Sequence, residues 1–258
     1  MSGTRRSQGV PRGTSGPGPQ PGPGSGSRWP PLSVVRWDDS HRLIPARYAD
    51  DDTDEPALAA LAEQDTDLPD LVALAAATNP RLMAQAGALP AGIHQDELVF
   101  GVPGWRIINA SFCHPHPLGS RFNGPDRGAW YAGQHVETSL AEVSHHRAVE
   151  LAEIGRWELV ATYRDHLADI HAPMHDLRGP RGRRARACLD PDSYVPGQAL
   201  AATLLSAGSL GVVYPAVRDP GRDAVACFRP AAVAHLRRGA TYTLTWSGSP
   251  KPQITQEG

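Results

Sequence analysis

The chain has 258 residues, with 25 basic and 27 acidic side chains and a formal net charge of −2. This near-neutral balance gives no electrostatic reason to expect nucleic acid as the main partner. The three cysteines are odd in number and lack CxxC spacing, which favours a reducing compartment over a disulfide framework. No apolar run reaches the length of a membrane helix and no signal-peptide pattern is found, so we expect a cytoplasmic protein.

The first 95 residues fall into two parts by composition. Residues 1–28 are mostly Gly, Pro, Ser and Arg and have too little apolar surface to offset the entropy of ordering, so we expect a disordered tail. Residues 29–95 are expected to form a partly helical N-terminal extension. Val34 and Val35 indicate a short strand, and leucines at helical spacing predict one or two helices between about 56 and 86.

Residues 96–246 carry the alternating elements of a compact domain, and the polar residues 247–258 are expected to form a loose tail. Short apolar runs between Gly and Pro predict strands, whereas longer amphipathic runs predict helices. Strands are expected at 98–102, 105–110, 130–132, 156–164, 210–214, 224–228 and 240–246, helices at 136–151 and 196–207, and a basic loop at 178–186.

Motifs of several common enzyme folds are absent from the sequence. It contains no GxGxxG, no P-loop lysine motif and no GxSxG. A Rossmann-type oxidoreductase is therefore not supported.

Two residues upstream of the predicted helix at 136–151 are of types that bind a nucleotide. Arg121 precedes a turn that starts at Asn123, and a guanidinium at a pocket rim binds phosphate or ribose through paired hydrogen bonds. Tyr131 lies in a short strand, where its ring can stack on a flat heterocycle such as nicotinamide. Taken alone, such residues are more often an ordinary surface Arg and a half-buried Tyr.

Glu142 admits two interpretations. With Ser139 it fits the Ser-x-x-Glu capping box of a helix start, which is a structural role. In a cleft, a Glu in the first turn of a helix also binds a sugar hydroxyl and stabilises the positive charge that develops when an N-glycosidic bond breaks. The spacing does not choose between the two.

The histidines and cysteines do not form a metal motif. Cys113, His114 and His116 are close in sequence, but the intervening prolines impose an extended path and no fourth ligand stands nearby. His145 and His146 are adjacent and do not share a helix face. No metal site is expected.

Taken together, SRFNGP (120–125), WYAG (130–133) and ETSLAEVSHHR (137–147) resemble the RES domain family of bacterial proteins, which is named for an Arg, a Glu and a Ser. Further blocks extend the resemblance over roughly residues 42–246 in the expected order. These blocks are LIPARY (43–48), TNPRL (78–82), DPDSY (190–194), PGQALAATLLSAG (196–208), GVVYP (211–215) and VRDPGRDAVACFRP (217–230).

The resemblance implies an α+β fold similar to that of ADP-ribosyltransferases, with a split mixed sheet, flanking helices and NAD in the cleft. Characterised family members consume NAD as a substrate, by phosphorolysis or hydrolysis of the nicotinamide–ribose bond, and inorganic phosphate is one candidate acceptor. By resemblance, Glu142 matches the catalytic Glu, and Arg121 and Tyr131 match residues that contact NAD. These three are the candidate catalytic residues. Asn123 and Arg218 are further candidates for NAD binding.

The resemblance also bears on partners. Many family members are toxins of toxin–antitoxin pairs, so a small helix-turn-helix antitoxin of the Xre type is the implied protein partner. A homodimer is left open, and neither nucleic acid nor a membrane is expected as a partner.

One position departs from the family pattern. The family Ser usually follows the Tyr-Pro step after the GVVYP-type strand, where this chain has Ala216. A missing hydroxyl costs about 1–3 kcal/mol of positioning, or roughly ten- to hundred-fold in rate, unless Ser206, Ser209 or a water replaces it. Two alternatives to NAD cleavage therefore stay open: a catalytically weakened nucleotide-binding or protein-interaction module, and ADP-ribosyl transfer to a macromolecule.

Overall fold

The computed structural model describes residues 29–49, 92–179 and 183–257, and within these ranges seven strands form one mixed sheet. The strands are β1 (Leu32–Pro45), β2 (Trp130–Gly133), β3 (Glu158–Asp176), β4 (Gly211–Pro215), β5 (Asp223–Cys227), β6 (Ala234–Ser247) and β7 (Gln253–Glu257). The helices are α3 (Trp105–Cys113), α4 (Val136–Ile154), α5 (Arg183–Cys188) and α6 (Val195–Ser206), with 3-10 turns at Ala46–Tyr48, Gln95–Glu97 and Pro230–Ala232. The predicted α+β class with a mixed sheet is confirmed. No helix of the described ranges has both the length and the apolar character needed to cross a bilayer.

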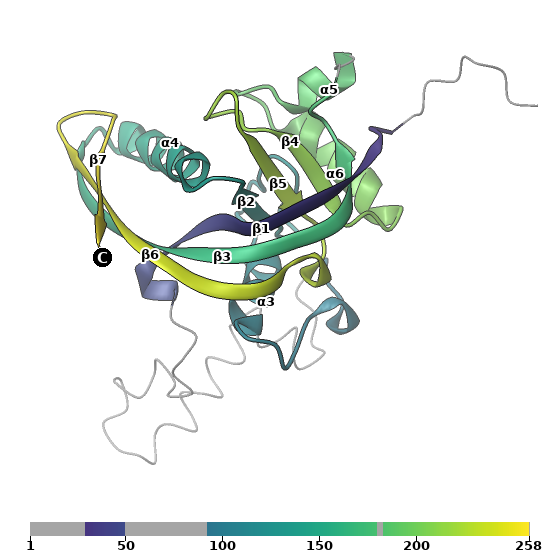
Figure 1. Ribbon diagram of the computed structural model, residues 1–258. Coiled ribbons are helices and arrows are strands. Elements are labelled where there is room, and N and C mark those ends of the chain that lie inside the picture. The colour runs from purple at the N-terminus through teal and green to yellow at the C-terminus, as the bar shows by residue number, and fades with distance from the viewer. Residues whose placement is uncertain (1–28, 50–91, 180–182, 258) are drawn as a thin grey trace, which may run out of the picture.

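The strand pairings close into a ring. The sheet order is β1-β2-β5-β4-β3-β6-β7, and β1 also pairs along its length with β3. β1 and β2 share a single pair, His41↔Gly133, whereas β1 and β3 are paired from Leu32↔His175 to Pro45↔Tyr163. A single pair therefore joins the ring at this point, and the main core lies inside the ring. Figure 1 shows β1, β3 and β6 as long curved neighbours, with the short strands β2, β5 and β4 above them.

Alternating side chains give the short strands two different faces. Val213 and Val225 point into the ring and pack with α3 in the main core. Tyr214 and Ala224, one residue away on the same strands, face outward and pack in a second cluster with α6. This period-two alternation of strands creates an outer floor on β2, β4 and β5. α4 lies beside this floor and packs on a third cluster with β1, β3 and β6.

The predicted strands at 98–102 and 105–110 are wrong. Residues 105–113 form the helix α3, because Ile108 and Phe112 are four residues apart and are buried on one face against the ring. β-branched and aromatic residues had favoured a strand, but this tertiary packing overrides their preference. The segment around Val99 is extended yet unpaired with any strand. The Asn109 side chain pairs with it instead, accepting a hydrogen bond from the Val99 amide at 3.1 Å and donating to the Val99 carbonyl at 2.8 Å.

The segment predicted as an N-terminal extension, residues 29–95, contributes a strand to the sheet. The short strand expected at Val34 and Val35 is the 14-residue β1, which pairs with β3 over most of its length. This strand precedes the domain predicted at 96–246 and belongs to the same sheet as the strands of that domain. The helices expected between about 56 and 86 and the tail at 1–28 lie outside the described residues.

Two further segments are more ordered than expected. Residues 253–257 form β7, which pairs antiparallel with β6 although all five side chains are exposed. Backbone pairing with β6 and polar contacts such as that of the Thr243 hydroxyl with the Glu257 carboxylate at 2.7 Å hold this strand, so no apolar pattern in the sequence gave a sign of it. The predicted basic loop at 178–186 overlaps α5, which begins at residue 183 and ends at residue 188.

Candidate active site

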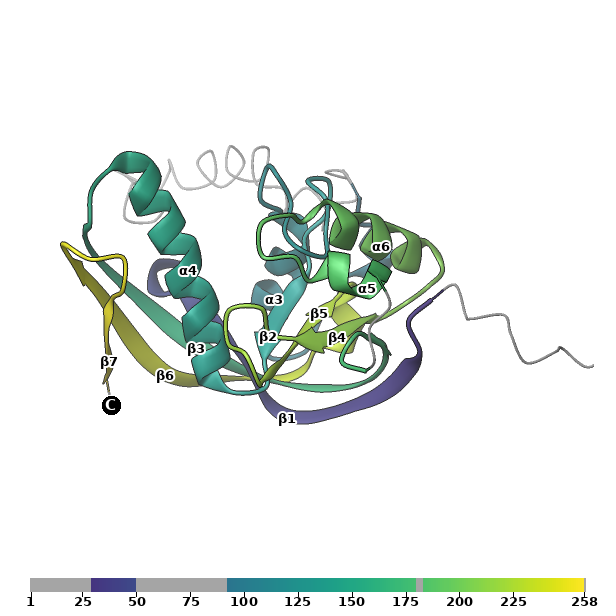
Figure 2. The same ribbon diagram turned by 90° about the horizontal axis from the view of Figure 1, so that it is seen from above.

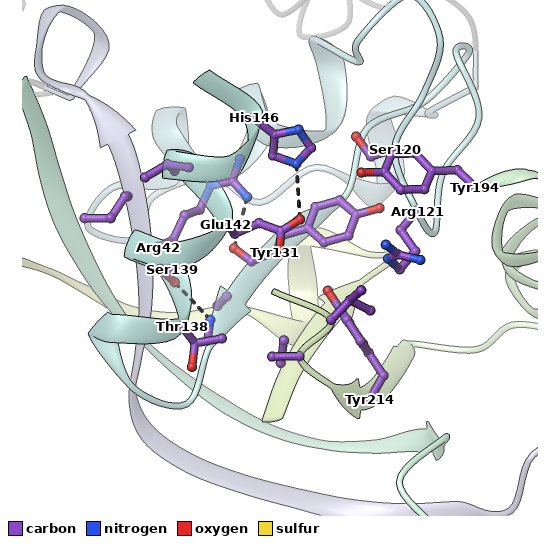
Figure 3. Close-up of a pocket in the computed structure, with 17 residues that line it drawn as sticks. Arg42, Ser120, Arg121, Tyr131, Thr138, Ser139, Glu142, His146, Tyr194 and Tyr214 are labelled. Atoms are coloured by element: carbon purple, nitrogen blue, oxygen red, sulfur yellow. Dashed lines mark hydrogen bonds and ion pairs between the residues drawn. The ribbon is translucent and has the colours of Figure 1, made fainter. Parts of the chain in front are cut away.

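A cleft of about 210 Å³ lies on the outer floor formed by β2, β4 and β5. α4 borders the floor on one side, and the chain leading into α6 borders it on the other (Figure 2). Arg121, Tyr131 and Glu142 all line this cleft (Figure 3). The structure therefore brings together the three residues that the sequence suggested for catalysis.

The start of α4 is tied to its surroundings by two hydroxyls. The helix begins at Val136, after His135 in extended conformation. Thr138 donates to the Asp219 carboxylate at 2.8 Å, and Ser139 donates to the His41 carbonyl at 2.7 Å. Ser139 lies inside the helix and also accepts from the Gly133 amide at 3.2 Å, so the capping box predicted for it is wrong.

Glu142 faces the cleft because of its position on α4. Ser139, Glu142, Val143 and His146 all line the cleft, and their spacing places them on one helix face. The Glu142 carboxylate is free of the helix cap and pairs with His146 Nε2 at 3.1 Å, and its side chain is 42% exposed.

The surroundings of Glu142 favour its ionised form. Burial acts to raise the pKa of this carboxyl, but the hydrogen bond and charge of His146 and the charges of Arg121 and Arg218 outweigh it. The pKa is consequently lower than usual, and the group is a carboxylate at neutral pH. A fixed negative charge in a cleft stabilises a positive charge that develops beside it.

Arg121 is 5% exposed and is held by backbone and ring contacts. Its Nη1 donates to the carbonyls of Asp190 at 2.5 Å and Cys188 at 3.4 Å, and its guanidinium lies 4.8 Å from the ring centre of Tyr194. Its Nη2 has no hydrogen-bond partner in the described part of the chain. A guanidinium with an unused donor at a cleft wall is suited to bind an oxygen-rich ligand.

Tyr131 presents its ring to the cleft while its hydroxyl is engaged elsewhere. The hydroxyl donates to Asn123 Oδ1 at 2.8 Å and accepts from the Phe122 amide at 2.8 Å. Asn123 in turn donates to the carbonyls of Gly124 at 2.8 Å and Arg127 at 2.9 Å. Asn123 does not line the cleft, so its observed role is to hold this turn and the Tyr131 ring. Burial raises the pKa of Tyr131, which therefore stays protonated.

Arg218 lies beside the cleft without lining it. It donates to the Pro191 carbonyl at 2.7 Å. Its positive charge nevertheless contributes to the low pKa of Glu142, and it acts with burial to lower the pKa of His145. Its action on the cleft is electrostatic in this structure.

Several cleft residues were not identified from the sequence. Arg42, Ser120, His146, Tyr194 and Tyr214 all line the cleft. They come from β1, a loop, α4, the residue before α6 and β4, so no local spacing relates them. A signal was available for four of them, since Ser120, His146, Tyr194 and Tyr214 each lie in a block of the family resemblance.

Comparisons with known proteins decide the family. Residues 101–247, more than half of the chain, match the RES domain. The chain belongs to the RES domain family. Among solved structures, the MbcT–MbcA toxin–antitoxin complex of M. tuberculosis is similar at 21% sequence identity and a TM-score of 0.39, over 50% of this chain and 73% of that chain. No curated protein sequence matches.

In this RES domain protein, Ala216 occupies the cleft wall at the position expected for the family Ser. Neither serine considered as a replacement reaches the cleft. Ser206 donates to the Ala202 carbonyl at 2.9 Å, and Ser209 bonds to the Gly211 carbonyl at 3.3 Å and to His175. Both hydroxyls are committed elsewhere, so they do not compensate for Ala216.

The RES domain shows no candidate metal centre in the part of the chain that the structure describes. No group of three or more His, Cys, Asp or Glu side chains is arranged to hold an ion there.

Proposed function

We propose that this RES domain protein binds NAD in the cleft and cleaves its nicotinamide–ribose bond. The observation that carries the proposal is the ionised Glu142 in one cleft with Arg121 and the Tyr131 ring. Clefts that enclose a whole drug-sized ligand are typically about 300–1,000 Å³. A cleft of about 210 Å³ suits one end of a dinucleotide, with the other end outside it.

Each residue has a distinct part in the proposed reaction. The Tyr131 ring packs against nicotinamide, and the free Nη2 of Arg121 donates to a phosphate or ribose oxygen. The Glu142 carboxylate accepts a hydrogen bond from a ribose hydroxyl and stabilises the oxocarbenium-like transition state. Nicotinamide leaves with the electron pair of the C–N bond and is released neutral. Phosphate or water then attacks the anomeric carbon and loses a proton to solvent.

The direct test is to incubate the purified full chain with NAD, with and without phosphate, and to measure free nicotinamide. Glu142→Gln should lower turnover by about 10²–10³-fold, because it removes a charge that acts on the transition state. Glu153→Gln is a matched control, since Glu153 is exposed on the same helix and does not line the cleft. Equal nicotinamide release by the wild type and Glu142→Gln would contradict the proposal.

Ala216 supports a second candidate function, that of a nucleotide-binding or protein-interaction module with weakened catalysis. The methyl group at this cleft position supplies no hydrogen bond to substrate or to Glu142. Calorimetry separates the two candidates. NAD binding without nicotinamide release would favour the binding module, whereas release that depends on Glu142 would favour the enzyme.

Membership of the RES domain family also supports a role as the toxin of a toxin–antitoxin pair. We expect expression of the chain to arrest growth, and Glu142→Gln to relieve the arrest. Co-expression with the neighbouring gene tests for the antitoxin, which we expect to be a small helix-turn-helix protein of the Xre type. Growth arrest that persists in Glu142→Gln would separate toxicity from the proposed chemistry.

A further inference from the structure

β7 is the last strand of the sheet, and only one of its two edges is paired in the described part of the chain. Its pairing with β6 runs from Gln253↔Thr245 to Glu257↔Thr241, and the sheet order ends at β7. Figures 1 and 2 both show this strand at the margin of the molecule, with no other labelled element beyond it. Its outer edge therefore presents a row of backbone N–H and C=O groups to a further strand.

The interior of β7 lacks the features that usually protect an edge strand. Such strands carry charges, prolines or bulges within the strand, which prevent pairing with another chain. The residues from Gln253 to Gln256 include no charge and no proline, and their register with β6 has no shift. Pro252 lies before the strand, where proline is tolerated. The edge is therefore open to strand pairing.

An apolar side chain lies at the middle of this edge. Ile254 is 43% exposed, although its partner in β6, Leu244, is fully buried in the third core cluster. Directly opposite residues of an antiparallel pair share one face of the sheet. The apolar surface of that cluster therefore continues to the open edge, where a further strand would cover Ile254.

Two charged residues flank the uncharged stretch. Lys251 lies two residues before β7, Glu257 is the last residue of β7, and both are exposed. Lys251 is the only lysine among the 25 lysine and arginine residues of the chain, and its ammonium group has no partner in the described ranges. The two side chains are about 20 Å apart along an extended strand, so they do not pair within one chain.

These features are self-complementary in one antiparallel register. When Ile254 lies opposite Ile254 of a second copy, Lys251 of each copy lies opposite Glu257 of the other. Apolar pairs and opposite charges that face each other across an antiparallel pair stabilise it. A register centred on Thr255 would instead set Ile254 against Gln256 and leave Lys251 with no carboxylate opposite it.

We propose that two copies of this chain associate through β7, in a two-fold antiparallel pair that continues the sheet from one copy into the other. A two-fold contact is closed, so it gives a dimer and not a filament. Residues 251–257 make a small interface, so the dimer is weak and its fraction rises with concentration. The inference is independent of the proposed function, because β7 does not line the cleft.

The first test is the sedimentation of the purified full chain over a range of concentrations up to about 1 mM, where even a millimolar Kd gives a visible dimer. Lys251→Glu turns two attractive pairs into two repulsive ones and should raise the Kd of the dimer by at least about tenfold. The double variant with Lys251→Glu and Glu257→Lys exchanges the charges and should restore the dimer.

A matched control reverses a charge elsewhere. Asp96→Lys lies at an exposed position outside β6 and β7 and should leave the Kd of the dimer unchanged. Thermal unfolding reports whether each variant folds. The wild-type measurements decide the outcome on their own if a variant does not fold.

The single lysine allows a second test on the wild type. A carbodiimide joins a carboxylate to an amine as an amide, and the reagent takes up the water that is lost. The cross-linked dimer should contain a Lys251–Glu257 link, which mass spectrometry of its peptides identifies. Lys251→Arg keeps the charge and the dimer but has no primary amine at this position, so the link should disappear.

The results separate the second copy from other occupants of the edge. Dimerisation that charge exchange restores, together with the Lys251–Glu257 link, supports the pairing. A chain that stays monomeric throughout, or a dimer whose Kd is the same in Lys251→Glu, overturns it. Protection of the β7 amides from hydrogen exchange that appears only when the product of the neighbouring gene is added would assign the edge to another protein and also overturn it.

Nicotinamide release distinguishes this inference from the proposed function. Lys251→Glu should release nicotinamide at the rate of the wild type, because the variant changes a surface outside the cleft. A monomeric wild type that releases nicotinamide contradicts only the dimer. A dimer that depends on Lys251 in a protein that releases no nicotinamide supports the β7 pairing and contradicts the proposed function.

Discussion

Glu142 and His146 lie one turn apart on α4, and their 3.1 Å contact sets the charge state of the cleft. The hydrogen bond and charge of His146, with the charges of Arg121 and Arg218, outweigh burial and lower the pKa of Glu142 below its ordinary value of 4.5. If the carboxylate form is required, activity is lost on the acid side only below this value. Removing the positive charge of His146 raises the pKa, so the acid limb moves to higher pH.

The corresponding experiment compares the pH profiles of kcat/KM for nicotinamide release in the wild type and His146→Gln. The acid limb of the variant should lie above that of the wild type. His145→Gln serves as the control, because His145 neighbours His146 in sequence but does not line the cleft. An acid limb that stays in place in His146→Gln would show that this contact does not govern Glu142.

Ala216 offers a gain-of-function test at the same scale. The residue is buried in the cleft wall, and Ser adds only one oxygen atom at a surface that borders open space. Ala216→Ser should raise kcat for nicotinamide release by up to about tenfold, since one hydrogen bond contributes about 1–1.5 kcal/mol. The measurement is steady-state nicotinamide release. A lower rate in the serine variant would contradict the prediction that a hydroxyl at position 216 assists the reaction.

The sequence identified part of the cleft and missed the rest for a physical reason. Arg121, Tyr131 and Glu142 occur within 22 consecutive residues, so one stretch of sequence revealed them together. Arg42 and Tyr194 reach the cleft only because the sheet closes into a ring and because the chain before α6 returns to Arg121. Long-range placement of this kind leaves no local pattern.

At the level of elements, the chain before α6 holds both arginines that act on Glu142. The carbonyls of Cys188 and Asp190 accept from Arg121, and that of Pro191 accepts from Arg218. Tyr194, the residue before α6, places its ring 4.8 Å from the Arg121 guanidinium. This segment, residues 188–194, therefore orients the guanidinium groups of Arg121 and Arg218, and we call it the clamp.

The clamp predicts a distinctive mutant pair at Tyr194. Tyr194→Phe keeps the ring and should behave like the wild type, whereas Tyr194→Leu loses the cation–π contact of about 0.5–2 kcal/mol. We expect Tyr194→Leu to raise KM for NAD several-fold with a smaller effect on kcat, because the proposed contacts of Arg121 are with parts of the substrate away from the breaking bond. Nicotinamide release at varied NAD concentration measures both constants. Equal kinetics for the leucine variant and the wild type would exclude the clamp.

The elements themselves were predicted unevenly. The helix at 136–151 and the strands at 210–214 and 224–228 were close to α4, β4 and β5, because their apolar periodicity is local and strong. β7 was missed because its backbone pairs with β6 while its side chains remain exposed. α3 was misassigned because its β-branched and aromatic residues favour strands outside this packing.

At the scale of the whole molecule, a polar cluster around Asp169 connects the three long strands β1, β3 and β6. Its carboxylate in β3 contacts Arg237 at 2.7 Å and His235 at 2.8 Å, both in β6, and accepts from the Asp39 amide of β1 at 3.4 Å. Asp39 and His235 are the two non-glycine residues with left-handed backbone in the described ranges, with φ of 54° and 48°. The strand registers also shift here, so the cluster lies where ladder bonding is interrupted.

The pKa of Asp169 gives this cluster a measurable signature. Hydrogen bonding from Arg237, and then from His235, outweighs burial and lowers the pKa of Asp169 from its ordinary value of 3.8 to about 2. A carboxyl whose pKa is lower in the folded state stabilises the fold above its unfolded pKa, and this contribution is lost as the pH falls towards the folded value. Asp169→Asn should therefore lower Tm at pH 7, and its difference in Tm from the wild type should shrink between pH 4 and pH 2.

Thermal unfolding across this pH range is the measurement, with Asp38→Asn, at an exposed position, as the control. Because Asp169 does not line the cleft, nicotinamide release by the folded variant should be unchanged. A Tm difference that is the same at every pH would show that the charge of Asp169 does not stabilise the fold.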